Sequence, residues 1–411
     1  MVAGPGVSVG RVPEADVESR RASFPLGAAV TVAELSGNPH PVLRRLRESE
    51  PVSWLPALGG WLITRADVAD AVLRDGRTFT VDDPRFTTAR VVGPSMLSLD
   101  GEPHRRHRDP FARALRTAST RARLADAASA HAVRLVADVA ALGGAAELRR
   151  GLAGQLAVAV MAEMLGLDVA PSQLLQWYDA IVAGVSSLAE VGVRTGTAVP
   201  PPAAAAFAEL SACVETALSR RDEQSVLTTA ASDLTVDEIV SNAAVLLFGG
   251  IETTEGMICN AVWYVLREEA AVERVRADRT LAAAAVEEAL RLEPAAAVVD
   301  RYATADVSLR DAAVRRGDLV TVSLAGANRD PSVFADPDSF DLHRPNGRQH
   351  LAFAIGPHFC IGAQLARQEA NAALAALLDT LPGLQLDPGQ PTEPRGLVFR
   401  KPPSLHVRWD G

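Results

Sequence analysis

The segment FAIGPHFCIG, residues 353–362, comes directly before the last helix that the sequence predicts. Cys360 therefore stands close to a helix N-terminus, where unpaired N–H groups and the helix dipole favour a thiolate over a thiol. Gly356 and Gly362 allow the backbone to approach a flat ligand, and Phe353 offers that ligand an aromatic face. These are the features of a cysteine that binds haem iron. The alternative for a cysteine in an apolar loop is a buried core residue.

A second unusual segment, GGIETT at residues 249–254, lies in the middle of a long predicted helix. Gly249 and Gly250 each cost about 1 kcal/mol relative to alanine inside a helix. That cost is expected where a ligand approaches the helix or where the helix opens for water. Glu252 followed by Thr253 can relay protons to whatever binds there. The alternative is a notch for helix packing, with a threonine that bonds back to its own helix.

Two pairs of charged residues have helical spacing. Glu288 and Arg291 are three residues apart, and such pairs are usually exposed and worth a few tenths of a kcal/mol. His104 and Arg108 are four residues apart and form a cationic face. That face is either a solvated helix edge or a clamp for an anion such as a buried carboxylate.

These motifs together resemble the signatures of the bacterial, soluble class I cytochrome P-450 family. The pattern Phe-x-x-Gly-x-x-x-Cys-x-Gly, the Gly-Gly-x-Glu-Thr-Thr segment and the Glu-x-x-Arg pair occur in that family's order and spacing, from about Ala33 to Trp409. The resemblance implies a haem-thiolate monooxygenase with haem b (iron protoporphyrin IX) as cofactor. Two positions depart from the pattern: Ala354 stands where many members have glycine, and Pro357 is uncommon at its position. Neither departure removes a ligand or a proton donor.

The resemblance also implies roles for individual residues. Cys360 is expected to be the iron ligand, and Thr253 and Glu252 the catalytic pair that helps protonate oxygen. Residues expected to surround the haem are Phe353, Gly356, Gly362, Gly249 and Gly250. The haem propionates are expected to be bound by His104, Arg108, Arg301 and His358. A buried structural triad that holds the cysteine loop is expected from Glu288, Arg291 and Arg344, and His350 is expected to be structural.

The fold class that the sequence predicts is mainly α with a smaller β-rich region (α+β), which the resemblance identifies as the cytochrome P-450 fold. Helical periodicity dominates from residue 102 to 289, with a break at Val191–Pro202 that contains three consecutive prolines. Other predicted elements are a Gly59-Gly60 hairpin within 51–65, helices at 66–74, 235–267 and about 362–380, and strands at 307–309 and 319–324. Residues 1–22 are expected to form a flexible N-terminal tail, and residues 23–411 one domain.

The composition restricts the environment and the partners. A net charge of −9 argues against nucleic acid or an anionic membrane surface as partner. No stretch approaches the roughly 18 apolar residues needed to cross a bilayer, and no secretory signal begins the chain. Three cysteines do not suggest a disulfide framework and fit a reducing cytoplasm, so a cytoplasmic protein is expected. Cys213 and Cys259 lie in apolar helical stretches and are expected to be core residues.

The family resemblance also sets expectations for partners and substrate. Since 411 residues leave no room for a reductase domain, electrons from NAD(P)H are expected to arrive through a ferredoxin and its reductase. Arg105 and Arg106 are candidate docking residues. The expected substrate is a hydrophobic small molecule, and the expected reaction is a tailoring step on a polyketide, terpene or cyclic peptide. Residues expected to line its pocket are Met96, Val245, Phe248, Ala297, Val299, Leu397 and Val398.

Three alternatives remain open at this point. One is oxidative C–C or C–N coupling without oxygen insertion, catalysed by the same kind of site. A second is an auxiliary protein that has lost haem, against which the presence of Cys360 and of the Glu-x-x-Arg pair argues. A third is a haem sensor or ligand carrier without turnover, which has no need of a proton relay such as Glu252 and Thr253.

Overall fold

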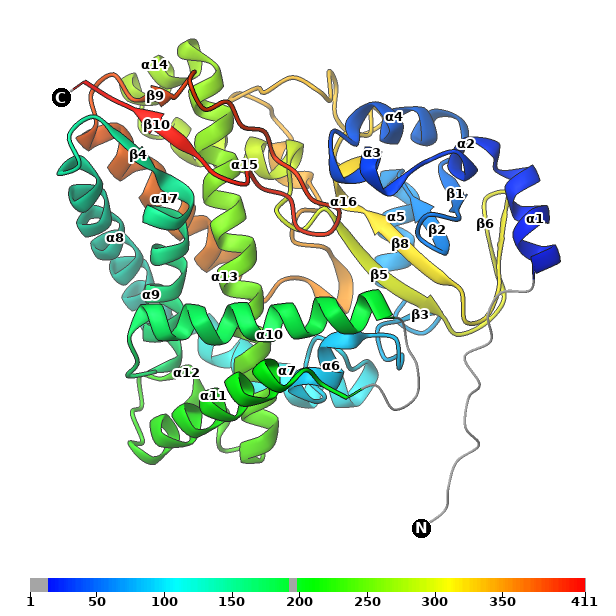
Figure 1. Cartoon of the computed structure of the whole chain (residues 1–411), viewed down its shortest axis with the longest axis horizontal. Coiled ribbons are helices and arrows are strands. Elements are labelled where there is room, and N and C mark those ends of the chain that lie inside the picture. Colours follow the sequence, from blue (N-terminus) through cyan, green and yellow to red (C-terminus); the bar gives the residue numbers. More distant parts are fainter. Residues whose placement is uncertain (1–13, 192–197, 411) are drawn as a thin grey trace.

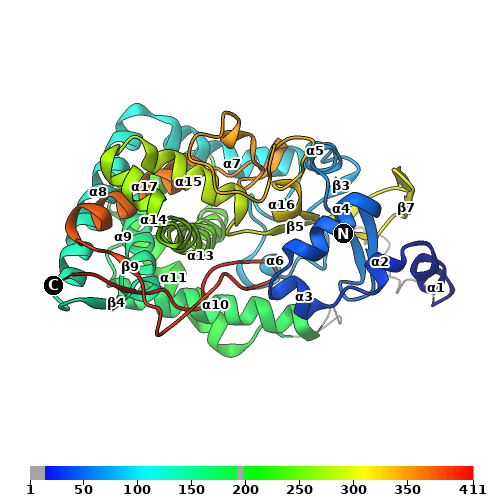
Figure 2. The ribbon, with the colours of Figure 1, turned by 90° about the horizontal axis from the view of Figure 1, so that it is seen from above.

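The computed structural model of the chain describes residues 14–191 and 198–410, and its helices gather around one central helix (Figure 1). This helix, α13, spans Val236–Arg267 and is buried along most of its length. It packs against α9 (Gly154–Leu165), α15 (Leu281–Leu292) and α17 (Ala363–Thr380). Figure 2 looks down α13 and shows it enclosed within the helical part of the molecule. A helix that is surrounded in this way must be apolar on nearly every face.

The start of α13 is determined by the predicted capping box. The Thr235 hydroxyl accepts a hydrogen bond from the Glu238 N–H, and the Glu238 carboxylate accepts one from the Thr235 N–H at 2.9 Å. Two N–H groups that a helix start leaves unpaired are thereby satisfied. The predicted helix over residues 235–267 is confirmed.

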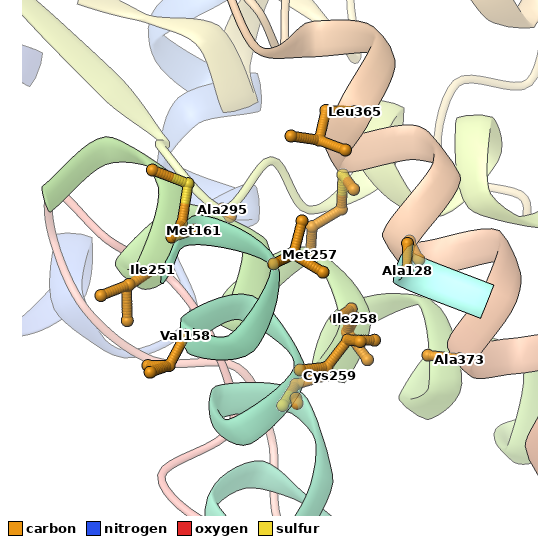
Figure 3. Close-up of a cluster of buried hydrophobic side chains, with 14 of the residues drawn as sticks. Ala128, Val158, Met161, Ile251, Met257, Ile258, Cys259, Ala295, Leu365 and Ala373 are labelled. Atoms are coloured by element: carbon orange, nitrogen blue, oxygen red, sulfur yellow. The ribbon is translucent and has the colours of Figure 1, made fainter. Parts of the chain in front are cut away.

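The apolar core of the helical part forms where α9, α13 and α17 meet (Figure 3). Gly250 of α13 is required by this packing, because a Cβ there would lie 2.3 Å from the Sδ atom of Met161 on α9. Figure 3 shows side chains from all three helices in one cluster, among them Val158, Met161, Ile251, Met257 and Leu365.

Helices α10 (Pro171–Val191) and α11 (Pro201–Ser219) pack on each other and against α13. The predicted break between them is confirmed at residues 198–200, which are irregular, while residues 192–197 lie outside the described residues. The last two prolines of the break occupy the first turn of α11. A proline is tolerated there because its missing N–H has no partner inside the helix in any case.

The β-rich part of the molecule contains a five-stranded sheet with the order β1-β2-β8-β5-β3. Its strands are β1 (Val52–Leu55), β2 (Gly60–Ile63), β8 (Leu319–Ser323), β5 (Val298–Ala303) and β3 (Phe79–Thr80). Strands β2 and β8 run parallel, and the other neighbours are antiparallel. Strands from both halves of the sequence therefore meet in one sheet, and β5 extends from it toward the helices (Figure 1). The prediction of a mainly α protein with a smaller β-rich region is confirmed.

The predicted hairpin is confirmed, but its two glycines serve different purposes. Gly59 has a φ of 62°, the left-handed conformation that glycine adopts most easily. Gly60 does not have a positive φ, which corrects the expectation that both glycines make the turn. A Cβ at Gly60 would lie 2.8 Å from the Leu319 carbonyl oxygen, so this glycine allows β2 to approach β8 closely.

The remaining elements complete the described chain. Helices near the N-terminus are α1 (Glu14–Ser23), α2 (Pro25–Ala28), α3 (Val32–Ser36), α4 (His40–Ser49), α5 (Ala66–Arg74) and α6 (Thr87–Val92). The other helices are α7 (Gly101–Arg116), α8 (Ala118–Ala140), α12 (Val226–Ala230), α14 (Glu269–Ala277) and α16 (Leu324–Ala327), with a π-helical turn, η1 (Arg149–Ala153), and the 3-10 turns η2 (Gly347–Gln349) and η3 (Gly356–His358). The other strands are β4 (Ala145–Glu147), β6 (Val307–Leu309), β7 (Ala312–Val314), β9 (Gln385–Leu386) and β10 (His406–Arg408).

The expectation of a flexible tail over residues 1–22 is wrong for its second half. Residues 14–23 form α1, and Arg20 of this helix is buried with an Nη2–Oδ2 distance of 2.9 Å to Asp318. The Arg20 guanidinium also lies over the Trp54 ring, 4.4 Å from its centroid. A buried arginine therefore docks the helix, together with Val17, which packs against the apolar cluster of the sheet. The hydrophobic pattern does not reveal the part of the arginine. Residues 1–13 lie outside the described residues.

Candidate active site

The loop that carries Cys360 has an unusual backbone with little freedom to vary. Ala354 and Gly356 have positive φ values of 52° and 75°. A Cβ at Gly356 would lie 2.4 Å from the carbonyl oxygen of Leu73, so only glycine fits. The Cys360 N–H donates to the Phe353 carbonyl at 2.9 Å, which closes the loop. The backbone therefore fixes the position of the Cys360 sulfur before α17 begins at Ala363.

The pKa of Cys360 is shifted in the direction opposite to the one that the helix-terminus argument predicts. Burial raises the pKa of this thiol, and the Gly362 N–H and the charges of Arg108 and Arg367 only partly oppose that effect. Cys360 lies three residues before the first residue of α17, so the helix dipole acts on it from a distance. A metal cation deprotonates a coordinating thiol outright. A bound metal ion therefore stabilises the Cys360 thiolate more than the dipole of α17 does.

Gly249 and Thr253 lie one helical turn apart on α13. A Cβ at Gly249 would meet no atom within 4 Å, so this glycine faces open space. The Thr253 hydroxyl donates to the Gly249 carbonyl oxygen of its own helix. This back-bonding was the structural alternative for the motif, and it places a hydroxyl beside the open face of Gly249.

Glu252, the other half of the predicted catalytic pair, is already engaged by two neighbours. Its Oε1 atom lies 2.8 Å from Lys401 Nζ, and its Oε2 atom accepts a hydrogen bond from the Tyr178 hydroxyl. Burial raises the pKa of Glu252, but Lys401 and Tyr178 outweigh it, so that the net pKa is lowered. Neither partner was predicted from the sequence.

The cationic residues predicted to bind propionates converge on one place. The rings of His104 and His358 have centroids 4.3 Å apart, and Arg108 donates to the carbonyl oxygen of Phe359. Arg301 is buried and donates to the carbonyl of its neighbour Asp300 at 2.7 Å. Burial and the charges of His358 and Arg108 lower the pKa of His104 to about 4. An anion placed among these groups would relieve their mutual repulsion.

A carboxylate that the sequence analysis did not single out, Asp100, organises this cationic cluster. It lies 2.8 Å from His358 Nε2 and accepts hydrogen bonds from the Thr80 hydroxyl and the Val81 N–H at 2.6 and 2.7 Å. Burial raises the pKa of Asp100, yet these hydrogen bonds lower it overall to about 2. Asp100 also interacts electrostatically with Arg301. Its position directly before α7, beside His104 in the sequence, was the available signal.

The structure brings the predicted triad together beside the segment that leads to the cysteine loop. The Arg291 Nη2 and Nε atoms lie 2.7 and 2.8 Å from the two oxygens of Glu288, and Arg344 Nε lies 2.8 Å from Glu288 Oε1. Arg291 also donates to three backbone carbonyls of the segment that leads to the cysteine loop, those of Asn328, Pro337 and Ser339. One buried guanidinium therefore connects α15 to this segment.

His350 is held by a carboxylate, and the other two cysteines lie on α11 and α13. His350 Nε2 lies 2.9 Å from Glu287 Oε2 and is buried, a structural arrangement. Cys259 is fully buried in α13, as expected of a core residue. Cys213 is only half-buried on α11, which corrects the expectation of a core position, because it lies at the outer edge of the contact between α10 and α11.

The residues predicted to line the substrate pocket do not form one group. Met96 and Val245 are buried in the same apolar cluster against which Phe248 packs. Ala297 and Leu397 belong to a separate cluster around α4, and Val299 packs against the cluster that covers the sheet. Val398 is 43% exposed.

Phe399, one residue further along, was missed by the sequence analysis. Its ring is 5.5 Å from that of Phe248 in an edge-to-face arrangement. Val398 lies in a bend, whereas Phe399 forms an isolated β-bridge with Ala296. The prediction of Val398 was therefore displaced by one residue from the side chain that contacts Phe248.

Known proteins resemble this chain over nearly its whole length. Residues 211–407 match the family model described as Cytochrome P-450. Mycinamicin IV hydroxylase/epoxidase from Micromonospora griseorubida is 36% identical over 390 residues, which cover 89% of this chain and 94% of that protein. The chain belongs to the cytochrome P-450 family. The cytochrome P-450 monooxygenase PikC from Streptomyces venezuelae is 33% identical over 401 residues, or 92% of each chain.

The structural comparison agrees with the assignment to the cytochrome P-450 family. The crystal structure of HmtN, a post-tailoring hydroxylase involved in himastatin biosynthesis, has a TM-score of 0.79 and 29% identity and covers 93% of this chain and 100% of its own. Cytochromes P-450 bind haem b and use O2 with electrons from NAD(P)H that a redox partner delivers, so the chain is an oxidoreductase and a monooxygenase. The predicted family, fold, enzyme class and cofactor are confirmed. Within residues 14–191 and 198–410, no helix is long and apolar enough to cross a membrane.

The residues of this cytochrome P-450 fit a haem group. His104 is 3% exposed, and its Nε2 atom has no hydrogen-bond partner among the described residues, as a propionate-binding donor would before it meets its anion. Positions for a Cβ at Gly249 and Gly362 are both free of atoms within 4 Å, so backbone on both sides can face a flat ligand. The Cys360 sulfur, three residues before α17, has the chemistry of a ligand for haem iron.

Proposed function

We propose that Cys360 Sγ ligates the haem iron and that the cationic cluster binds the haem propionates. The members of that cluster are His104, Arg108, Arg301 and His358. The observation that carries the proposal is the buried, unpartnered Nε2 atom of His104, whose ring centroid lies 4.3 Å from that of His358, in a group of basic side chains organised by the Asp100 carboxylate. When bound, haem supplies oxygen activation, and its thiolate ligand donates electron density that favours O–O cleavage.

The remaining site residues position groups and move protons. Gly249 keeps α13 free of side-chain atoms on its open face, and the Thr253 hydroxyl lies one turn away with Gly249 O as its acceptor. A hydroxyl in this position can exchange that acceptor for a reacting group and pass on a proton. Glu252 is the adjacent carboxylate from which such a proton would be replenished. The Glu288, Arg291 and Arg344 triad holds the segment that leads to Cys360.

The substrate of this reaction is, in our proposal, a hydrophobic small molecule, and the reaction tailors a natural product. The apolar side chains of Met96, Val245 and Phe248 and the ring of Phe399 support an apolar ligand. The named relatives act on mycinamicin IV or take part in himastatin biosynthesis. A polyketide, a terpene or a cyclic peptide is the class that we infer on these grounds.

A ferredoxin with its reductase is the redox partner that we propose. Phe359, next to Cys360, is 44% exposed and offers an apolar contact close to the iron ligand. Of the two arginines predicted to dock the partner, Arg106 pairs with Glu238 through Nη2 and Oε2 at 2.8 Å, whereas Arg105 is exposed on the same helix. Arg105 is therefore the better candidate, and Arg105→Glu should raise the KM for ferredoxin more than Arg106→Glu.

Turnover with a surrogate ferredoxin, its reductase, NADPH and a panel of macrolides, terpenes and cyclic peptides tests the proposed function. Isotopically labelled O2 should place one labelled atom in the product, and Cys360→Ala should abolish the reaction. Ring-coupled product without label would instead establish oxidative coupling. A wild-type protein that binds haem and consumes no NADPH with any ligand would contradict an enzymatic role.

A further inference from the structure

Glu252 is held by partners from two different parts of the chain. Tyr178 of α10 donates to Oε2, and Lys401, which follows the last long loop, lies 2.8 Å from Oε1. The side chains of Glu252 and Lys401 are only 15% and 10% exposed, and Tyr178 is buried. An ion pair shielded from water in this way is much stronger than one at the surface.

Lys401 also contacts a second carboxylate. Its Nζ atom lies 2.9 Å from Oε2 of Glu255, which is fully buried one turn along α13. The other oxygen of Glu255 lies 2.8 Å from Nε of Arg149 in η1. Cations and carboxylates therefore alternate along one chain of contacts, in the order Arg149, Glu255, Lys401 and Glu252. Each carboxylate in this chain is paired with a cation, and Arg150 Nε also lies 3.9 Å from Glu255, so that the charges can be buried.

The backbone holds Lys401 in this position. Its N–H donates to the Arg395 carbonyl at 3.2 Å, and its carbonyl accepts from the Arg395 N–H at 3.0 Å. Gly256 of α13 faces this segment, and a Cβ there would lie 3.6 Å from Lys401 Cβ and 3.0 Å from Ala295 Cβ. The small residue allows the segment to lie close to the helix. The fixed backbone therefore keeps the lysine within reach of both carboxylates.

These contacts determine what Glu252 can do at rest. Both of its oxygens are occupied, and the groups that face it are Tyr178 from α10, Lys401 from the C-terminal segment, Glu255 from α13 and Arg149 from η1. With its pKa lowered, Glu252 carries no proton near neutral pH. The neighbouring Thr253 hydroxyl donates to its own helix. Both members of the predicted proton relay are therefore present, but each is bound to another group of the protein.

We propose that Lys401 and Tyr178 are positioning residues that clamp Glu252, and that proton delivery toward Thr253 begins when the contact between Glu252 and Lys401 opens. This inference rests on the proposed function of Thr253 and Glu252. The clamp sets when the carboxylate is released, and neither Lys401 nor Tyr178 touches the reacting atoms.

Four variants separate the clamp from the rest of the charge chain. Lys401→Met removes the cation and keeps most of the aliphatic stem, Lys401→Arg keeps the charge, and Tyr178→Phe removes one hydroxyl. Arg149→Met is the matched control, because it takes a cation from the same chain and leaves both contacts of Glu252 in place. Since Tyr178→Phe removes only a hydroxyl group, it tests the clamp even if Lys401→Met does not fold.

The first measurement does not depend on turnover. Infrared difference spectra against a Glu252→Gln reference, recorded over a pH series, report protonation of the Glu252 carboxyl. Lys401→Met should raise the pH midpoint by about 1 to 3, the range expected when a neighbouring opposite charge is lost. Tyr178→Phe should raise it less, Arg149→Met should raise it least because Arg149 acts on Glu252 without touching it, and Lys401→Arg should stay close to wild type. A midpoint unchanged in both Lys401→Met and Tyr178→Phe, or raised as much in Arg149→Met, would overturn the clamp.

The second measurement tests the opening step during turnover. In the wild type, product formation should be slower in D2O than in H2O, and this solvent isotope effect should shrink in Lys401→Met and Tyr178→Phe. Product formed per NADPH consumed should fall in the same two variants and remain near wild type in Arg149→Met. Equal isotope effects in all variants would refute the opening step. If no protein turns over, the proposed function fails, while the infrared midpoints still decide whether Glu252 is clamped.

Discussion

Arg291→Met should destabilise the protein strongly although the side chain is far from any substrate. The substitution removes two hydrogen bonds to Glu288, at 2.7 and 2.8 Å, and three to the backbone carbonyls of Asn328, Pro337 and Ser339. Arg291 and Glu288 are both buried, so water cannot replace what is lost. Removal of one partner from a buried ion pair typically costs about 3–5 kcal/mol.

This cost converts into a measurable shift of the melting temperature. An unfolding entropy of about 2.1 cal/mol/K per residue gives roughly 0.9 kcal/mol/K for 411 residues. The expected decrease in Tm is then about 3 to 6 °C. The exposed pair Arg74 and Asp70, with side chains 61% and 48% exposed, is the matched control. Arg74→Met should shift Tm by less than about 1 °C, because water screens this exposed pair.

Differential scanning calorimetry of the haem-loaded protein, with the two variants in the same buffer, measures both shifts. The haem should also dissociate faster from Arg291→Met, because Arg291 holds the segment that leads to the Cys360 loop. A Tm for Arg291→Met within 1 °C of Arg74→Met would refute the view that the buried triad stabilises this loop.

Two further predictions concern the cysteine loop and the acid limit of stability. In urea unfolding, Gly356→Ala should cost about 3 kcal/mol or more, because its Cβ would lie 2.4 Å from the Leu73 carbonyl oxygen. Gly101 also has a positive φ but no atom within 4 Å of a Cβ, so Gly101→Ala should cost only about 1 kcal/mol. Equal losses in the two variants would refute the close approach at Gly356. Burial raises the pKa of Glu293, but His40, Arg400 and Arg329 lower it overall from 4.5 to about 2. The ionised Glu293 carboxylate therefore contributes to folding stability above about pH 4.5, and this contribution is lost as the pH falls toward 2. Glu293→Gln should therefore lower stability at pH 7 and flatten its decline between pH 4.5 and 2, and an unchanged slope would contradict this assignment.

Much of the fold follows from local sequence signals because each signal has one dominant physical cause. The capping box at Thr235 and Glu238 satisfies the N–H groups at a helix start, and the structure begins α13 there. The prolines before α11 could only lie in a loop or a first helical turn, and they do. Gly356 and Cys360 could be recognised because so few residue types tolerate their backbone and chemistry.

What could not be predicted depends on pairs of residues far apart in the sequence. Arg20 binds Asp318, and Lys401 reaches Glu252, contacts that no local periodicity encodes. Asp100 stood beside a recognised motif, but its role depends on where His358 arrives in the fold. The exchange of Val398 for Phe399 shows the other kind of error, because the bend at Val398 and the bridge between Phe399 and Ala296 decide which side chain reaches Phe248.

The absorption difference spectrum of the reduced, carbon-monoxide-bound protein tests most directly whether Cys360 is the haem ligand. The three cysteines of the chain provide matched variants. Wild type, Cys213→Ala and Cys259→Ala should all show the long-wavelength Soret band of thiolate-ligated haem, and Cys360→Ala should lose it. Retention of that band in Cys360→Ala, or its absence from well-folded wild-type protein, would contradict the account.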